Sequence, residues 1–335
     1  MASSFSVGNH TSSNLSDHFY FYSKNVFAVC SILLLLLGMP GNILLLLVLI
    51  RGLWRKSGGH IARLTEPLFI SIVALDLLFF LSNIPVLFAS AIFKEGKMSH
   101  LLCVINHSLN LWISFADFYS MVAVSLLRYA AVIHPMCVMP VSPKQMALLC
   151  VFIWVLCLLL SIPLWIHYET IHAKGEAACV NQTVGKEMNL YLQLLGGVGF
   201  LPPLLLMIFC YSRIISTLRA RRALSIHTAS SLQVNWRATV MALVTMAALV
   251  AMWLPYWLVI FFISYEEFLT TASKYLAYHL ISLLAFARRC INPIICFCLS
   301  YQFQARLRNL FQGLQNGKHQ LGAIYKGEIE VLGSI

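Results

Sequence analysis

The sequence is short of charged residues, and acidic residues are the scarcest of them. Charged side chains make up 10% of the 335 residues, with 12 acidic residues against 23 basic ones, whereas soluble domains are about 25% charged. Hydrophobic residues make up 60% of the chain, and the mean hydropathy is +0.81. A water-soluble core could not absorb this much apolar surface. The composition therefore excludes a soluble globular fold and predicts a protein of the lipid bilayer.

The chain also lacks the motifs of common enzyme classes. It has no P-loop, no His/Cys cluster spaced as a metal site, and no Ser, His and Asp in the order of a hydrolase triad. We therefore expect no enzyme activity, no cofactor and no metal. Residues 1–25 are polar and rich in Ser and Asn, so they do not form the apolar core of a signal peptide.

Seven apolar runs are each long enough for a membrane-spanning helix, which needs about 20 residues. They cover residues 26–50, 67–93, 100–133, 144–166, 188–218, 236–263 and 272–298. The pattern predicts an all-α membrane protein, a seven-transmembrane helix bundle whose two ends lie on opposite sides of the membrane.

Basic residues gather in the segments on one side of these runs and indicate the orientation of the chain. They are Arg51, Arg55, Lys56, Arg63, Arg213, Arg219, Arg221, Arg222, Arg237, Arg306, Arg308 and Lys318. The segments on the opposite side mix both signs, so we expect the N-terminus outside the cell and the C-terminus in the cytoplasm. This distribution also explains the net charge of +11 without a nucleic-acid partner.

N-x-[ST] patterns then predict glycosylation outside the cell at Asn9, Asn14 and Asn181.

Two of the 10 cysteines differ from the rest, most of which lie inside apolar runs. Cys103 begins the third run at the predicted outer face, and Cys179 lies in the second outer loop. Both lie on the oxidising side, where disulfides persist. We expect a bond between them that fixes the loop across the top of the third helix.

Four charges inside apolar runs form the most unusual feature of the sequence. Arg288 and Arg289 interrupt the seventh run, where each unpaired charge costs about 2.5–3.5 kcal/mol to insert. Asp76 and Asp117 interrupt the second and third runs. Because arginine binds carboxylates in a bidentate manner, the sequence predicts that the four charges meet inside the bundle.

At this point the chain resembles the rhodopsin-like (class A) G-protein-coupled receptors, over residues 26 to 314. The matching residues occur in the family's order: Gly41, Asn42, Leu75, Asp76, Cys103, Cys179, Arg128, Tyr129, Trp154, Pro203, Tyr211, Trp253, Leu254, Pro255, Asn292 and Pro293. The overall pattern is similar to that of peptide receptors near the galanin branch. The resemblance implies an extracellular tail over 1–25, a seven-transmembrane domain over 26–300, a short amphipathic eighth helix over 301–314 and a cytoplasmic tail over 315–335.

The resemblance also implies roles for individual residues. The switch residues would be Trp253, Pro255, Asn292, Pro293 and Tyr211, and a heterotrimeric G protein would contact Arg128 and Tyr129. Pro255 removes a backbone hydrogen bond, so the sixth helix can kink there and swing its inner end outward. The implied location is the plasma membrane, with arrestin as a further partner.

Several residues depart from the family pattern. Leu127 stands where an acid usually precedes the arginine, Asn235 stands near a second acidic position, and Cys296 replaces a tyrosine. In the family, the pocket that holds Asp76 often binds sodium, and the positions of Arg288 and Arg289 usually carry small polar residues. We therefore expect an arginine to take the place of the sodium ion.

The family places the ligand in the outer half of the bundle. The implied contacts are Asn110, Ser114, Tyr256, Trp257, Ile260, Tyr278, Ser282 and Phe286. An amine receptor would carry an aspartate where Asn110 stands, and an opsin would carry a lysine where Phe286 stands. The aromatic lining and a hairpin-like second outer loop favour a peptide or lipid-like ligand.

Three alternatives to a ligand-activated receptor stay open. Within the family, the changes at Leu127 and Cys296 are compatible with a non-signalling decoy or a constitutively active orphan receptor. Outside it, buried charges also mark transporters and channels, although the chain shows no internal repeat of the kind found in transporters. An intramembrane hydrolase could use Asp76 and Asp117 as an acid pair, but two nearby arginines argue against free carboxylates.

Overall fold

The computed structural model describes residues 7–54, 60–92, 100–173, 176–181, 186–224, 229–263, 271–300, 303–310 and 312. The helices are α1 (Val7–Trp54), α2 (His60–Ile92), α3 (His100–Ile133), α4 (Pro135–Val138), α5 (Pro143–His167), α6 (Lys186–Gly199), α7 (Leu201–Leu224), α8 (Ala229–Ile263) and α9 (Thr271–Leu299). The strands are β1 (Tyr168–Ala173) and β2 (Glu176–Asn181). A further short helix, which we call the eighth helix, covers residues 303–310.

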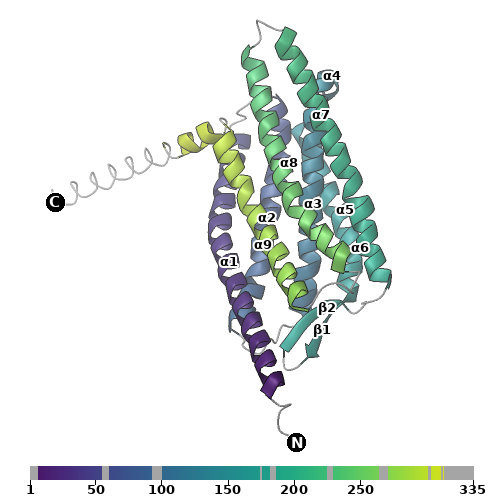
Figure 1. Cartoon of the computed structure of the whole chain (residues 1–335). Coiled ribbons are helices and arrows are strands. Elements are labelled where there is room, and N and C mark those ends of the chain that lie inside the picture. The colour runs from purple at the N-terminus through teal and green to yellow at the C-terminus, as the bar shows by residue number, and fades with distance from the viewer. Residues whose placement is uncertain are drawn as a thin grey trace, which may run out of the picture.

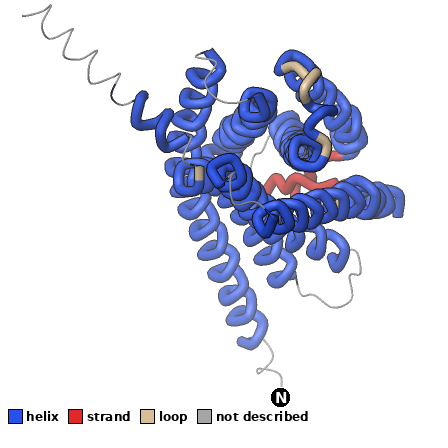
Figure 2. The backbone as a smooth tube through the Cα atoms, turned by 90° about the horizontal axis from the view of Figure 1, so that it is seen from above, coloured by secondary structure: helices blue, strands red, loops and turns tan. Residues whose placement is uncertain are grey.

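The helices form a bundle in which the long axes run between two ends of the molecule (Figure 1). Figure 2 looks down this bundle and shows most helices nearly end-on. The N-terminus and the β-hairpin lie at one end, which we call the hairpin end, and α4 lies at the other, which we call the α4 end. The seven predicted runs correspond to α1, α2, α3, α5, α6 with α7, α8, and α9.

Length and composition identify membrane-crossing helices within the described part of the chain. Five segments qualify: Asn25–Trp54, His60–Ile84, Val104–Ile133, Pro143–Pro163 and Gln193–Ala223. Thr239–Pro255 of α8 is a shorter apolar stretch. Because a bilayer offers no water to backbone groups, continuous helices that satisfy their own hydrogen bonds are the structure expected of such segments.

The limits of the elements differ from the prediction at two places. α1 begins at Val7 rather than near Val26, because the helix continues into the polar segment. The described part of the predicted eighth helix covers 303–310, and the other residues of 301–314, apart from Gln312, lie outside the described residues. The fifth span is divided at Phe200, where Pro202 and Pro203 follow and cannot donate backbone hydrogen bonds to the preceding turn.

The predicted hairpin-like loop is confirmed as an antiparallel pair of strands. β1 pairs with β2 from Tyr168 opposite Asn181 to Ala173 opposite Glu176, and Thr170 lies opposite Cys179. The side chains of Cys103 and Cys179 lie outside the described residues, so the disulfide stays a prediction. The glycosylation positions Asn9, Asn14 and Asn181 likewise have no described side chains.

We expect Cys103→Ser or Cys179→Ser to lose surface expression, because either change removes the predicted bond that would fix the hairpin to α3. Loss of a native disulfide typically costs about 2–5 kcal/mol. Surface expression measured by flow cytometry tests the prediction, and Cys137→Ser, at an exposed position in α4, is the matched control. Mass spectrometry that finds both thiols free in folded protein would contradict it.

Candidate functional site

The centre of the bundle holds a buried charge cluster made of Arg288, Arg289, Asp76 and Asp117. The aspartates are fully buried, and the two arginines are 4% and 1% exposed. Arg289 Nη1 lies 2.7 Å from Asp76 Oδ1 and 3.3 Å from Asp117 Oδ2. Arg288 Nη2 pairs with Asp117 Oδ2 and lies 3.7 Å from Asp76 Oδ1. The two positive and two negative charges balance, which suits a site without solvent.

Polar side chains from several helices complete the cluster. Asn292 Nδ2 donates to Asp76 Oδ2 at 2.7 Å, and Arg289 Nη2 donates to Ser114 Oγ at 3.3 Å. The Arg289 guanidinium also lies 4.7 Å from the centre of the Phe79 ring, a cation–π contact. The cluster therefore includes Ser114, which the sequence assigned to the ligand pocket.

α1 contributes to the cluster through the backbone of Arg289. Asn42 Nδ2 donates to the carbonyl oxygens of Gly38 and Arg289, each at 2.9 Å. The same amide thus joins α1 to α9 next to the ion pairs. Together these contacts tie α1, α2, α3 and α9 at the same depth in the bundle.

We expect no sodium ion in this cluster. Asp76 already accepts from Arg289 on one oxygen and from Asn292 on the other. Asp117 Oδ2 pairs with both arginines. Two guanidinium groups at these distances would repel another cation, and the carboxylates offer it no uncompensated charge. The arginines supply covalently the positive charge that an ion would otherwise bring.

We therefore expect the thermal stability of the protein to be unaffected by sodium as a specific ion. Melting temperature of the purified protein in NaCl, KCl and choline chloride at equal concentration tests this, because general screening acts equally in all three. A shift that occurs in sodium alone would contradict the prediction.

An aromatic layer packs next to the charge cluster. Phe286 packs edge-on against Phe79 with ring centres 5.0 Å apart, and it also approaches Phe80 at 6.2 Å. Trp253 stacks on Phe200 at 5.7 Å and meets Phe115 and Phe118 at 5.8 and 6.0 Å. Pro255 lies within α8, two residues beyond Trp253. The layer thus connects the proline of the sixth span to α3 and to the break between α6 and α7.

Asn110 belongs to a ladder of amides that joins α2 to α3. Asn83 Nδ2 donates to Asn110 Oδ1 at 3.0 Å, and Asn110 Nδ2 donates to Asn83 Oδ1 at 3.3 Å and to Asn106 Oδ1 at 3.4 Å. Asn83 also donates to the carbonyl oxygen of Phe79 at 2.8 Å. Both N–H groups of Asn110 are therefore donated within the protein. Asn83 and Asn106 were missed in the sequence, although Asn106 precedes Asn110 by one helical turn.

The other predicted ligand contacts divide into two groups. Phe286 is buried in the aromatic layer. Tyr256, Trp257, Ile260, Tyr278 and Ser282 lie in α8 and α9, and their side chains are outside the described residues. Their ligand contacts stay predictions.

Arg128 and Tyr129 lie near the α4 end of α3. Leu127 is buried, and Arg128 Nε is buried without a hydrogen-bond partner among the described residues. Tyr129 packs against His134 and Phe209 with ring centres 6.0 and 6.1 Å apart. One turn before Arg128, Ser125 Oγ donates to the hydroxyl oxygen of Tyr211 at 3.1 Å, which joins α3 to α7.

A third buried acid, Glu66, was not predicted. It lies near the start of α2, and Arg306 Nη2 of the eighth helix lies 2.7 Å from its Oε1. Asp76 and Asp117 were predicted to be buried because they lie inside apolar runs, whereas Glu66 immediately precedes the second run and does not meet this criterion. Phe303 packs next to this pair, edge-on against Phe69 at 6.4 Å.

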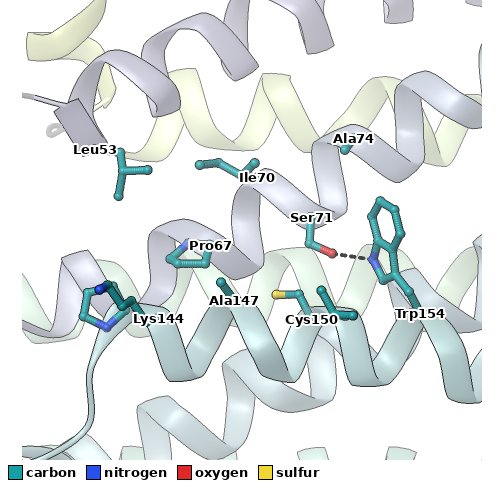
Figure 3. A pocket seen from close by; sticks show the side chains of 11 residues that line it. Leu53, Pro67, Ile70, Ser71, Ala74, Lys144, Ala147, Cys150 and Trp154 are labelled. Atoms are coloured by element: carbon teal, nitrogen blue, oxygen red, sulfur yellow. Dashed lines mark hydrogen bonds between the residues drawn. The ribbon is translucent and has the colours of Figure 1, made fainter.

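A groove of about 520 Å³ lies on the side of the bundle between the end of α1, α2 and α5 (Figure 3). Its lining is apolar apart from Ser71, Lys144, Cys150 and Trp154. Trp154 Nε1 donates to Ser71 Oγ at 2.8 Å (Figure 3). The groove therefore offers an apolar surface next to the exposed side chains Leu148, Val151 and Phe152, which suits contact with lipid.

Comparison with known proteins agrees with this arrangement. Residues 41–296 match the 7 transmembrane receptor (rhodopsin family). The chain is 28% identical over 287 residues to galanin receptor type 3 of Mus musculus, which covers 83% of this chain and 76% of that receptor. It is 28% identical over 298 residues to the B1 bradykinin receptor of Canis lupus familiaris, covering 84% and 81%, and 29% identical over 299 residues to the histamine H2 receptor of Cavia porcellus, covering 86% and 80%.

These relatives are receptors and not enzymes, and they cover most of the chain. The match to the family spans α2 to α8 entirely and includes the residues of the buried charge cluster. The chain therefore belongs to the rhodopsin family of seven-transmembrane receptors and is a multi-pass G-protein-coupled receptor.

Proposed function

We propose that this receptor binds an extracellular peptide or lipid-like ligand and activates a heterotrimeric G protein through an outward movement of α8. The hairpin end faces the outside of the cell and the α4 end faces the cytoplasm, and the receptor lies in the plasma membrane. The distribution of basic residues supports this orientation. From here on we call the two ends outer and inner.

The aromatic layer supports the movement of α8. Trp253 lies against rings from α3 and from the α6–α7 break, and Pro255 follows it in the same helix. A ligand that shifts these rings would change the packing of Trp253, and the missing backbone hydrogen bond at the proline lets the inner part of α8 swing. Arg128 and Tyr129 at the inner end of α3 would then meet the G protein.

The amide ladder is the observation that favours a peptide over an amine, although the histamine H2 receptor is among the relatives. A cationic amine needs a carboxylate partner, whereas Asn110 is neutral and its N–H groups are donated to Asn83 and Asn106. The relatives named for galanin and bradykinin, both peptides, agree with a ligand of this class.

Guanine-nucleotide exchange tests the proposed function. We would place the purified receptor in lipid nanodiscs with a panel of heterotrimeric G proteins and screen a peptide library and a lipid library for faster exchange. Acceleration by a peptide or a lipid-like molecule is the expected result. Exchange that stays at the receptor-free rate with every G protein and ligand would instead favour the non-signalling decoy, and fast exchange without any ligand would favour constitutive activity.

We expect any kinase-dependent binding of arrestin to depend on the third inner loop, the polar segment from the end of α7 to the first residues of α8. Beyond Gln315 the chain has only Tyr325 and Ser334 as hydroxyl side chains. Ser225, Thr228, Ser230 and Ser231 follow a basic stretch at the end of α7, and each phosphate would add about two negative charges there. Alanine at these four positions should remove most arrestin recruitment in a proximity assay. If truncation after Gln315 removes recruitment while the four alanines do not, the prediction is wrong.

A further inference from the structure

The ion pair between Glu66 and Arg306 joins two elements that the chain keeps far apart. Glu66 lies in the second turn of α2, close to the inner end of that helix. Its side chain is nevertheless buried, since Glu66 is only 3% exposed. Arg306 lies on the eighth helix, with its Nη2 2.7 Å from Glu66 Oε1 and a side chain that is 15% exposed. Glu66 Oε2 is buried without a hydrogen-bond partner among the described residues. Arg306 is thus the cation that compensates this carboxylate.

Gly52 makes room for the Arg306 side chain on its way to α2. A Cβ atom added at Gly52 would overlap the Arg306 guanidinium, including its Nη1 atom, its Cζ atom at 2.6 Å and its Nε atom at 3.2 Å. Gly52 is in the last turn of α1, so the guanidinium crosses directly over that turn. Any side chain at this position would displace Arg306 or force it to bend.

Two further contacts fix the eighth helix. Phe303 packs on Phe69, one turn beyond Glu66 in α2, and it is buried together with Leu310 against α1 and α2. Gln304 Nε2 donates to the carbonyl oxygens of Phe297 and Cys298 at 2.8 and 3.1 Å, which caps the end of α9. The eighth helix is therefore joined to the end of α9 by hydrogen bonds and to α2 by an ion pair and an aromatic contact.

Ionic contacts between α2 and the α9 side of the bundle thus occur at two depths. Asp76 meets Arg289 in the charge cluster, and Glu66 meets Arg306 nearer the inner surface. At 1.5 Å per residue, the two acids are about 15 Å apart along α2. The backbones of α2 and α9 approach each other only sparsely, since α9 packs mainly on α1 and α8. The long arginine side chains supply the connection that backbone packing does not.

We propose that Glu66 and Arg306 form a latch which, with the charge cluster, holds α9 and the eighth helix against α2 as one body. Two ion pairs at different depths along α2 prevent α9 and the eighth helix from both sliding and rotating against it. A single ion pair would leave rotation about that contact free. In this receptor the inner ends of α7 and α8 are then the parts left to move against that body. The latch goes beyond the proposed function, because it restrains the eighth helix whether or not a ligand or a G protein is bound.

Hydrogen exchange of the intact receptor in nanodiscs tests the latch. Removing Arg306 leaves a buried, uncompensated carboxylate, so the eighth helix should leave its place on α2 and its amides should open more often. We expect Arg306→Ala to speed exchange of residues 303–310 by about tenfold. Arg308→Ala, at an exposed position on the same helix, is the matched control and should change exchange less than twofold.

Two variants separate the ion pair from a general loss of packing. The exchanged pair Glu66→Arg with Arg306→Glu should recover most of the protection, because it restores opposite charges. Gly52→Ala should speed exchange as Arg306→Ala does, and adding it to Arg306→Ala should have no further effect, since the side chain it would displace is already gone. Equal exchange in Arg306→Ala and the parent receptor would overturn the proposal, and so would an exchanged pair that remains unprotected.

The same exchange measurements separate the latch from the proposed function. None of these readouts uses a G protein, so their failure would leave the proposed function untouched.

Discussion

Replacing Arg288 with alanine should destabilise the receptor by about 3–5 kcal/mol, because it leaves one positive charge for two buried carboxylates. Arg288 pairs with Asp117 Oδ2, and both side chains are almost fully buried. After the substitution, Arg289 alone would lie between Asp76 and Asp117, and the cluster would carry a net negative charge in a medium with little solvent. We expect little surface expression and a strongly lowered melting temperature in detergent.

The double change Arg288→Asn with Asp117→Ser should recover expression, because it removes opposite charges together. Asp76 keeps its two partners, Arg289 and Asn292, in this variant. Arg308→Ala serves as the control for loss of an arginine as such, since that residue is exposed. If Arg288→Ala is expressed and melts like the parent receptor, the ion pairs do not hold the bundle together. If the double change is as poor as the single one, charge balance is not the reason for the loss.

Gly38→Ala should destabilise the receptor by about 1–3 kcal/mol, since a single methyl group there enters a filled space. The added Cβ would lie 2.7 Å from Cys290 Sγ and 2.8 Å from a carbon of the Phe80 ring, closer than such atoms pack. Gly38 also supplies the carbonyl oxygen that accepts from Asn42, so a shift of α1 would disturb the contact of Asn42 with Arg289. Melting temperature of the purified receptor measures the effect.

Gly197→Ala in α6 is the matched control, because, apart from its own helix turn, no atom of the described residues lies within 4 Å of the added methyl group. Alanine is the better helix former by roughly 1 kcal/mol, so this variant should melt at the same temperature as the parent receptor or slightly higher. Gly38→Ala should therefore lower the melting temperature, and Gly197→Ala should not lower it. A Gly38→Ala variant as stable as Gly197→Ala would show that α1, α2 and α9 do not approach as closely as described.

The sequence by itself determined the class of fold and the family. A chain with 60% hydrophobic and 10% charged residues, arranged in long apolar runs, has only helices available as membrane-crossing structure. The adjacent arginines also required acidic partners, because an unpaired charge in a membrane span is costly. With Asp76 and Asp117 inside other apolar runs, that cost was enough to predict which four residues meet.

Contacts between helices that do not follow from helical periodicity were decided by the tertiary structure alone. The spacing of Asn110 and Ser114 on α3 placed both in one stripe, but only the packing shows that Ser114 meets Arg289 and that Asn110 meets Asn83. Glu66 was not among the predicted buried charges because it precedes an apolar run instead of interrupting one, and only the tertiary structure shows that it is buried beside Arg306 of the eighth helix. A polar side chain becomes buried when another part of the chain packs against it. The sequence of a single helix does not show which part that will be.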